Sequence, residues 1–191
     1  MKLRRTLATG AVAGLLLVAL PSAAMADDVV RNGNYTVPAG TTIDGNLTVR
    51  NGTVTIHGTV EGNVTQTGSG SVNITRTGEV DGNVTESGTG GVRVAGEVDG
   101  NVNEHSTGHV EITSTGKVDG NVTERSGGSV DVRGKVDGNV TESGNGHLTL
   151  ARTARIDGNV AESGAGNLYV YRGAKVDGNI KESGTGSRIN R

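Results

Sequence analysis

The chain has 191 residues, among them 33 glycines, two prolines, three tyrosines and no Cys, Phe or Trp. This composition argues against a conventional enzyme with an aromatic-rich core, and it excludes disulfide scaffolds, cysteine-based metal sites and collagen. The formal net charge is −2, and without clustered basic residues and stacking aromatics nucleic acid is not an expected partner.

Residues 1–26 are expected to be a secretory signal peptide. Basic residues at positions 2, 4 and 5 precede an apolar run over 11–20, which is too short to span a bilayer. Ala24-Met25-Ala26 fits the small-x-small pattern that signal peptidase accepts. Cleavage after Ala26 predicts a secreted or cell-envelope protein with no membrane span in the mature chain. The mature chain would keep 15 basic and 20 acidic residues, a net charge of −5.

A pentad that reads apolar, acidic, Gly, Asn, apolar recurs eight times, beginning with Ile43-Asp44-Gly45-Asn46-Leu47. An apolar-x-apolar triplet precedes each copy, from Tyr35/Val37 to Leu168/Val170. Such alternation is typical of half-buried strands, and nothing in the array has a helical period. The asparagines of the pentads, 17 to 20 residues apart, are Asn46, Asn63, Asn83, Asn101, Asn121, Asn139, Asn159 and Asn179.

These repeats predict an all-β fold, a parallel β-solenoid of about eight coils of 17–20 residues over residues 35–183. A single repeat cannot bury a core, so the copies must stack. From Val64 onward only the step from triplet to pentad varies, between four and six residues, which places the variable loop on one edge and favours a right-handed coil. A tandem of hairpins is the competing architecture. Residues 27–34 are expected to be a short polar segment and residues 184–191 a disordered polar tail.

Stacking turns equivalent positions into columns along the rod. The eight asparagines are expected to form a structural ladder, with side-chain amides hydrogen-bonded from one coil to the next. The Gly-Asn step before each strand is expected at a corner that needs left-handed backbone angles.

The same stacking predicts two acidic columns. We interpret both as a solvated charged face, because a catalytic site is normally a singular constellation whereas these acids belong to the repeat. Stacked carboxylates could instead hold a cation or share a proton. Cations at Lys117, Lys135, Arg155 and Lys175 are expected beside the first column, where they would bridge adjacent coils. The first column holds Asp44, Glu61, Asp81, Asp99, Asp119, Asp137, Asp157 and Asp177, and the second holds Glu86, Glu104, Glu124, Glu142, Glu162 and Glu182.

The sequence predicts no catalytic constellation, no cofactor and no metal site. His109 and His147 share one coil position but would lie two coils apart, too far to bind one zinc ion. Tyr169 and Tyr171 are expected to point outward near the last coil, where they would contact a sugar or a partner or cover the end of the rod. An interrupted threonine column argues against ice binding and comprises Thr48, Thr65, Thr85, Thr123 and Thr141.

The glycine-rich coils, such as Gly96-Glu97-Val98-Asp99-Gly100-Asn101-Val102, resemble those of bactofilins. That resemblance covers roughly residues 35–183 and implies a β-helix that polymerises end to end without nucleotide. The chain differs from typical bactofilins, which are cytoplasmic and membrane-associated, in its expected signal peptide. Residues 35–43 also resemble the first coil of secreted right-handed β-helix proteins, including adhesins and polysaccharide lyases.

We therefore expect a secreted, non-enzymatic structural or cell-surface solenoid. Its terminal strands lack obvious caps, which favours self-association by head-to-tail stacking. One alternative is a protein that binds or degrades polysaccharide, with cell-envelope polysaccharide as its partner. Another is an ice- or mineral-binding module.

Overall fold

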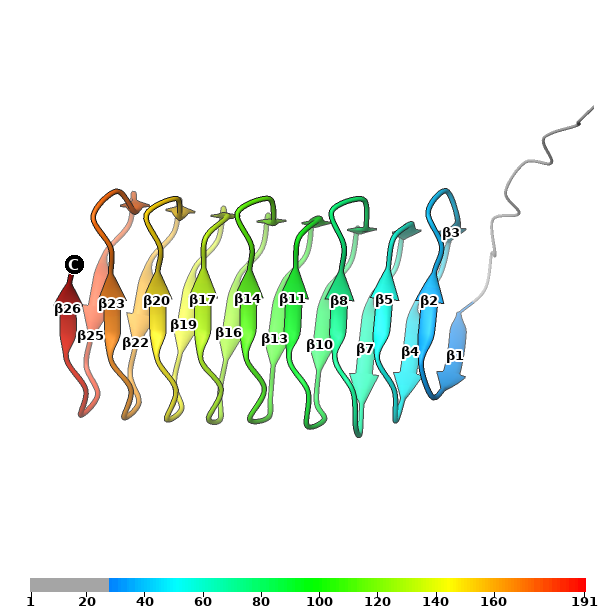
Figure 1. Cartoon of the computed structure of the whole chain (residues 1–191), viewed down its shortest axis with the longest axis horizontal. Coiled ribbons are helices and arrows are strands. Elements are labelled where there is room, and N and C mark those ends of the chain that lie inside the picture. Colours follow the sequence, from blue (N-terminus) through cyan, green and yellow to red (C-terminus); the bar gives the residue numbers. More distant parts are fainter. Residues whose placement is uncertain (1–27) are drawn as a thin grey trace, which may run out of the picture.

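The computed structural model describes residues 28–191, so the expected signal peptide lies outside the described residues. Within them the chain forms 26 strands and no helix, and every strand pairing is parallel. The strands are arranged in coils that follow one another in chain order along a rod (Figure 1). No helix in this part of the chain is long and apolar enough to cross a membrane.

Each coil contributes one strand to each of three sheets, which we call the first, second and third sheet in chain order. The first sheet holds β1 (Val29–Asn32), β4 (Leu47–Arg50), β7 (Val64–Thr67), β10 (Val84–Glu86), β13 (Val102–Glu104), β16 (Val122–Glu124), β19 (Val140–Glu142), β22 (Val160–Glu162) and β25 (Ile180–Glu182). The second holds β2 (Tyr35–Val37), β5 (Val54–Ile56), β8 (Val72–Ile74), β11 (Val92–Val94), β14 (Val110–Ile112), β17 (Val130–Val132), β20 (Leu148–Leu150), β23 (Leu168–Val170) and β26 (Arg188–Asn190).

The third sheet is the shortest, because its strands span two residues each and it has one member fewer. It holds β3 (Thr42–Ile43), β6 (Thr59–Val60), β9 (Glu79–Val80), β12 (Glu97–Val98), β15 (Lys117–Val118), β18 (Lys135–Val136), β21 (Arg155–Ile156) and β24 (Lys175–Val176). The described chain therefore makes eight complete coils and a partial ninth made of β25 and β26. The predicted parallel solenoid of about eight coils is confirmed, and the tandem of hairpins is excluded.

The register places each pentad directly over the preceding one. Val84 pairs with Val64 on one side and with Val102 on the other, as the stacking of repeats predicts. Because strand side chains alternate between faces, the apolar residues of all three sheets turn inward. In a central coil Val122, Val130 and Val136 are fully buried and stack on their counterparts above and below. The core is thus a set of aliphatic columns.

The connections explain the variable repeat length. Four residues join β8 to β9 but only two join β11 to β12, and both connections lie between the second and third sheets. The four-residue connection forms a turn in which the Gly78 N–H donates to the Thr75 carbonyl at 2.9 Å. The two-residue difference therefore lies on one edge of the rod, as expected.

The pentad glycines serve a different purpose from the one the sequence suggested. Among the described residues, positive φ occurs at Asn51 and at five glycines, and none of these belongs to a pentad. The expected left-handed corner is therefore wrong. Glycine is needed there because the coils approach closely: a Cβ on Gly82 would lie 2.6 Å from the Gly62 carbonyl oxygen in the preceding coil.

The solenoid extends beyond its expected bounds at both ends. β1 lies within the polar segment 27–34 and pairs with β4, and β26 lies within the tail 184–191 and pairs with β23. Neither strand carries a full pentad or an apolar triplet, so the repeat pattern misses them. Each is held by backbone hydrogen bonds to the neighbouring coil, such as that from Leu168 N to Ser187 O at 3.0 Å.

Candidate functional site

The structure brings the eight asparagines into one column along the edge between the third and first sheets. From Asn63 to Asn159, each residue donates its backbone N–H and its Nδ2 to the Oδ1 of the preceding asparagine, at 2.8–3.1 Å. Asp28 takes the place of an asparagine at the first coil, where its Oδ1 accepts from Asn46 N and Nδ2. Asn179 ends the column with a single bond from its N–H to Asn159 Oδ1. Because the column holds the coils in register, its role is structural.

The first acidic column lies on the outside, and two of the four expected cations bridge adjacent coils beside it. Lys117 Nζ lies 2.6 Å from Glu97 Oε1 and 2.8 Å from Asp119 Oδ1. Lys135 Nζ lies 2.6 Å from Asp137 Oδ1 and 3.7 Å from Asp157 Oδ2. Arg155 instead donates to the carbonyl oxygens of Ala154 and Gly173, and Lys175 takes part in none of the ion pairs found between residues 28 and 191.

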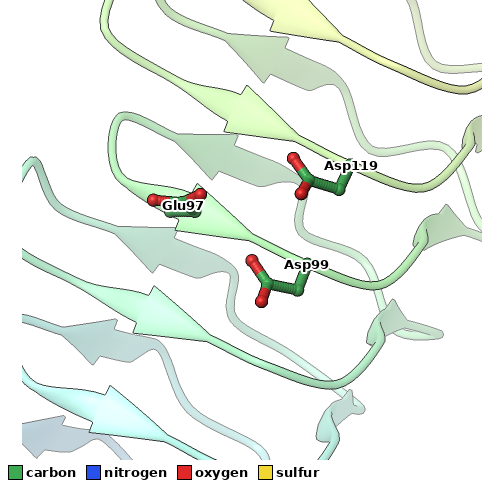
Figure 2. Close-up of side chains that lie close together, drawn as sticks. All are labelled: Glu97, Asp99 and Asp119. Atoms are coloured by element: carbon green, nitrogen blue, oxygen red, sulfur yellow. The ribbon is translucent and has the colours of Figure 1, made fainter.

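Glu97, Asp99 and Asp119 form an acidic cluster in which one oxygen of each lies within 4.8 Å of the others (Figure 2). Burial raises the pKa of Asp99, and the negative charges of Asp119 and Glu97 raise it further. Lys117 compensates the cluster, and hydrogen bonds from its ammonium to Asp119 and Glu97 raise the pKa of Lys117 in turn. The ammonium group of Lys117 thus neutralises part of the negative charge of this cluster.

The second acidic column is not part of the solvated face. The side chains of Glu86, Glu104, Glu124, Glu142 and Glu162 have no exposed surface at all. The expectation of two solvated columns is therefore wrong for this one. Its members end the strands of the first sheet and point inward beneath the connection to the second sheet, where the turn amides bind them.

The signal that identifies these buried acids was present in the sequence. Val84, Thr85 and Glu86 form one strand, and side chains two residues apart share a face. Since Val84 points inward, so does Glu86. The following Ser-Gly-x-Gly turn supplies backbone N–H donors close to that carboxyl, such as Gly88 N at 2.8 Å from Glu86 Oε1.

The structure places Tyr169 and Tyr171 on the outside near the C-terminal end, both half-buried. The Tyr169 ring packs edge-on against His147, with 5.5 Å between centroids, and its hydroxyl accepts from Asn167 Nδ2 at 3.2 Å. The Arg191 guanidinium lies 4.8 Å from the Tyr169 ring centroid and 5.9 Å from that of Tyr171. The tyrosines thus anchor the chain terminus onto the last complete coil.

Two of the remaining candidate residues, His109 and His147, form hydrogen bonds between adjacent coils. His109 Nδ1 accepts from Ser129 N at 2.8 Å, and His147 Nδ1 accepts from Asn167 N at 2.9 Å. These histidines thus take acceptor positions comparable to those of the asparagine column. Thr48, Thr65 and Thr85 line a shallow polar groove beside the asparagines.

The two ends of the rod present strands with one unpaired edge. Within residues 28–191, β1 pairs only with β4, and β25 and β26 pair only with β22 and β23. At the C-terminal end Val170, Val176 and Ile180 remain partly exposed, whereas their counterparts in inner coils are fully buried. At the N-terminal end Val30 is 51% exposed. Both ends therefore offer backbone donors, backbone acceptors and apolar surface to a further coil.

Comparison with protein families identifies these coils. A family model described as "Bactofilin: Polymer-forming cytoskeletal" matches residues 35–126 and again residues 85–181. The chain belongs to the bactofilin family. The two matches overlap and together span most of the solenoid. Comparison with curated proteins found no match, and comparison with solved structures found none either.

Membership of the bactofilin family bears on self-association. The family is a structural, polymer-forming one, so self-association is a family property. It gives no support to the alternatives of polysaccharide or ice binding. The end coils are the places where the described chain leaves strand edges unpaired.

Proposed function

We propose that this bactofilin is an exported structural subunit without catalytic activity, whose solenoids join end to end into a polymer. The observation that carries the proposal is the unpaired edge of a parallel strand at each end of the rod. An open edge pairs with any strand of matching register, and heterologous pairing of one end with the other generates an unlimited filament.

The charges of one column favour head-to-tail joining. Arg31 of β1 and Glu182 of β25 occupy the two ends of the column that holds the buried glutamates. Continuing the register from one copy to the next would place Glu182 beside Arg31 of the following copy. Arg31 is exposed in the single chain, where its guanidinium lies 5.1 Å from the Tyr35 ring centroid. The junction would thus pair an anion with a cation.

The junction is expected to be weaker than the inside of the solenoid. The ninth coil has no strand in the third sheet, so two joined copies leave one strand missing on that side. Fewer hydrogen bonds cross the junction than cross any pair of inner coils. Filaments should therefore dissociate into folded subunits before the subunits unfold.

Electron microscopy and sedimentation of residues 27–191 test the assembly. We expect filaments, shortened by Arg31→Glu or Glu182→Arg alone and restored when both reversals are combined in one chain. Arg76→Glu, at an exposed turn between β8 and β9 in the third coil and outside both terminal coils, is the matched control. Strictly monomeric particles across protein and salt concentration would contradict polymerisation. Filaments whose length is unchanged by either charge reversal would contradict only the head-to-tail register.

Export rests on the amino-terminal sequence, and its test is separate. When the full chain is expressed in a bacterium, we expect the exported fraction to begin at Asp27. Ala24→Arg should block cleavage because signal peptidase requires a small residue there. A full-length chain that stays in the cytoplasm would overturn export and leave the assembly proposal standing.

A further inference from the structure

The strongest unexplained feature of the molecule is the row of carboxyl groups inside it. Six glutamates lie in register at the ends of consecutive strands of the first sheet. Five of them are fully buried, and Glu182 in the last coil is partly covered. Neighbouring strands of a sheet are about 4.8 Å apart, so each carboxyl has another directly above or below it.

One oxygen of each carboxyl is held by the turn that follows its strand. Glu104 Oε1 accepts from the N–H and the hydroxyl of Ser106 at 2.8 and 2.6 Å. Glu124 Oε1 accepts from the N–H groups of Ser126, Gly127 and Gly128 at 2.9–3.1 Å. These bonds fix each carboxyl in place under its turn.

In five of the six glutamates the other oxygen has no donor among the described residues, whereas Glu86 Oε2 accepts from Ser106 Oγ at 3.2 Å. Oε2 is buried and without a hydrogen-bond donor in Glu104, Glu124, Glu142, Glu162 and Glu182. A buried oxygen that gives up water without gaining a donor is costly. Since the adjacent strands carry the same residue in register, each of these carboxyl groups faces the carboxyl groups of the neighbouring coils.

No cation of the described chain forms an ion pair with this column. Along the column, the glutamates of the adjacent coils are the charged groups that face each carboxyl. From the turns come serine hydroxyls and backbone N–H groups. His105 and Arg125, which follow Glu104 and Glu124 directly, are exposed. His109 and His147, at the far end of the turns, use Nδ1 to accept backbone N–H groups.

We propose that the column is a proton-binding ladder, in which protonated glutamates donate their acidic hydrogen to the carboxylate of the next coil. A row of buried, uncompensated negative charges at one-coil spacing would repel strongly. Binding a proton removes a charge and also supplies the donor that Oε2 lacks. The ligand of the column is therefore the proton, held at neutral pH by groups that in water would release it.

The electrostatics of individual members agree with this arrangement. Burial raises the pKa of Glu104 to about 8, and the adjacent Glu86 and Glu124 contribute. Burial likewise raises the pKa of Glu142 to about 8, together with Glu124 and Glu162. In Glu182 the neighbouring Glu162 is the main cause of a raised pKa.

One position of the buried column is occupied by an uncharged residue, Gln66. Gln66 precedes Glu86 in the same column and is equally buried. Its Nε2 donates to the carbonyls of Gly52, Thr67 and Ser69 at 3.0–3.2 Å. A neutral amide therefore fits this interior, and glutamine is a suitable replacement for a protonated glutamate.

The ladder makes folding depend on pH in a defined direction. The folded state holds protons that the unfolded chain, with an ordinary glutamate pKa near 4.3, has released. The stability that the ladder contributes is therefore greatest below about pH 4.5 and is lost as the pH rises towards 8. Each proton retained in the folded state changes the unfolding equilibrium constant roughly tenfold per pH unit in this interval.

The test compares residues 27–191 with its Glu124→Gln variant. We expect the infrared band of protonated carboxylic acid in the wild type at pH 7, a weaker band in Glu124→Gln, and a smaller loss of stability between pH 5 and 9 in that variant. Glu61→Gln, at an exposed position of the outer column, should change neither. No acid band at pH 7, or equal pH dependence in wild type and Glu124→Gln, would overturn the proposal.

A second measurement separates protons from metal cations. Unfolding is followed at pH 7 after treatment with a chelator and again with added Ca²⁺. The proton ladder predicts the same stability in both conditions. A stability that the chelator lowers and Ca²⁺ restores in the wild type but not in Glu124→Gln would show that cations compensate the column, and would overturn the proposal.

Discussion

Asn101 donates two hydrogen bonds to the Oδ1 of Asn83 in the preceding coil, from its backbone N–H and its Nδ2, both at 2.8 Å. Its own Oδ1 accepts the same pair of bonds from Asn121 at 2.8 and 2.9 Å. Each asparagine thus satisfies a backbone N–H of the next coil that no carbonyl reaches. The column is an integral part of the hydrogen bonding between coils.

Asn101→Ala should therefore lower the free energy of unfolding by about 0.5–1.5 kcal/mol, because it removes the acceptor of the two hydrogen bonds that Asn121 donates. Chemical denaturation measures the change. Asn103→Ala, two residues later on the outer face of β13, is the control and should cost less than about 0.5 kcal/mol. Equal losses for the two variants would mean that the ladder adds nothing to the stack.

Substitutions at Gly120 and Gly127 distinguish two reasons for a glycine: close contact between coils and the conformational freedom of the unfolded backbone. A Cβ on Gly120 would lie 2.5 Å from the Gly100 carbonyl oxygen, whereas a Cβ on Gly127 would meet only the Thr107 methyl group at 3.7 Å. Gly120→Ala should push the coils apart and destabilise the protein by about 1–3 kcal/mol. Gly127→Ala should be neutral or stabilise by up to about 1 kcal/mol. Thermal unfolding tests both, and a neutral Gly120→Ala would refute the packing argument.

The repeat pattern predicts the solenoid well because stacking repeats the same contacts in every coil. The pairing of Val64 with Val84 and the edge that carries the variable loop both follow from spacing alone. The pattern fails where the repeat is broken. β1 and β26 have no full pentad, yet an adjacent coil offers them backbone partners, and that edge is enough to order them.

The buried glutamates show a different failure. Alternation along the strand places Glu86 on the inward face with Val84, but charged residues are rarely buried without a partner. Charge predicts that Glu86 is exposed, whereas alternation predicts that it is buried, and the expectation of a solvated column followed the charge. The surroundings that make burial possible come from the folded chain. The following turn donates a backbone N–H to the Glu86 carboxyl, and the next coil places the Glu104 carboxyl beside it.

Lys117 is predicted to control the cluster of Glu97, Asp99 and Asp119. Lys117→Gln removes the charge that lowers the pKa of Asp99, so that pKa should rise further above its usual value. Carboxyl titration by NMR measures it. Because these groups are exposed, unfolding should become easier by less than about 1 kcal/mol, and high salt should abolish the difference. Lys175→Gln, in the same column but outside the ion pairs of the described residues, is the control. An unchanged Asp99 pKa in Lys117→Gln would contradict the assignment.

Deleting residues 184–191 tests whether the tail is a structural coil. The deletion removes β26 and with it the acceptor of Leu168 N and the donor to the Val170 carbonyl, a bond of 2.9 Å from Arg191 N. It also uncovers Leu168, which is now fully buried; exposing such a side chain costs about 1.5–3 kcal/mol. We expect faster hydrogen exchange in β23 and a lower denaturation midpoint. Arg191→Ala removes only the contacts with Tyr169 and Tyr171 and should cost about 1 kcal/mol or less. A truncated chain with unchanged exchange in β23 would mean that the tail is a passive extension, as its polar sequence first suggests.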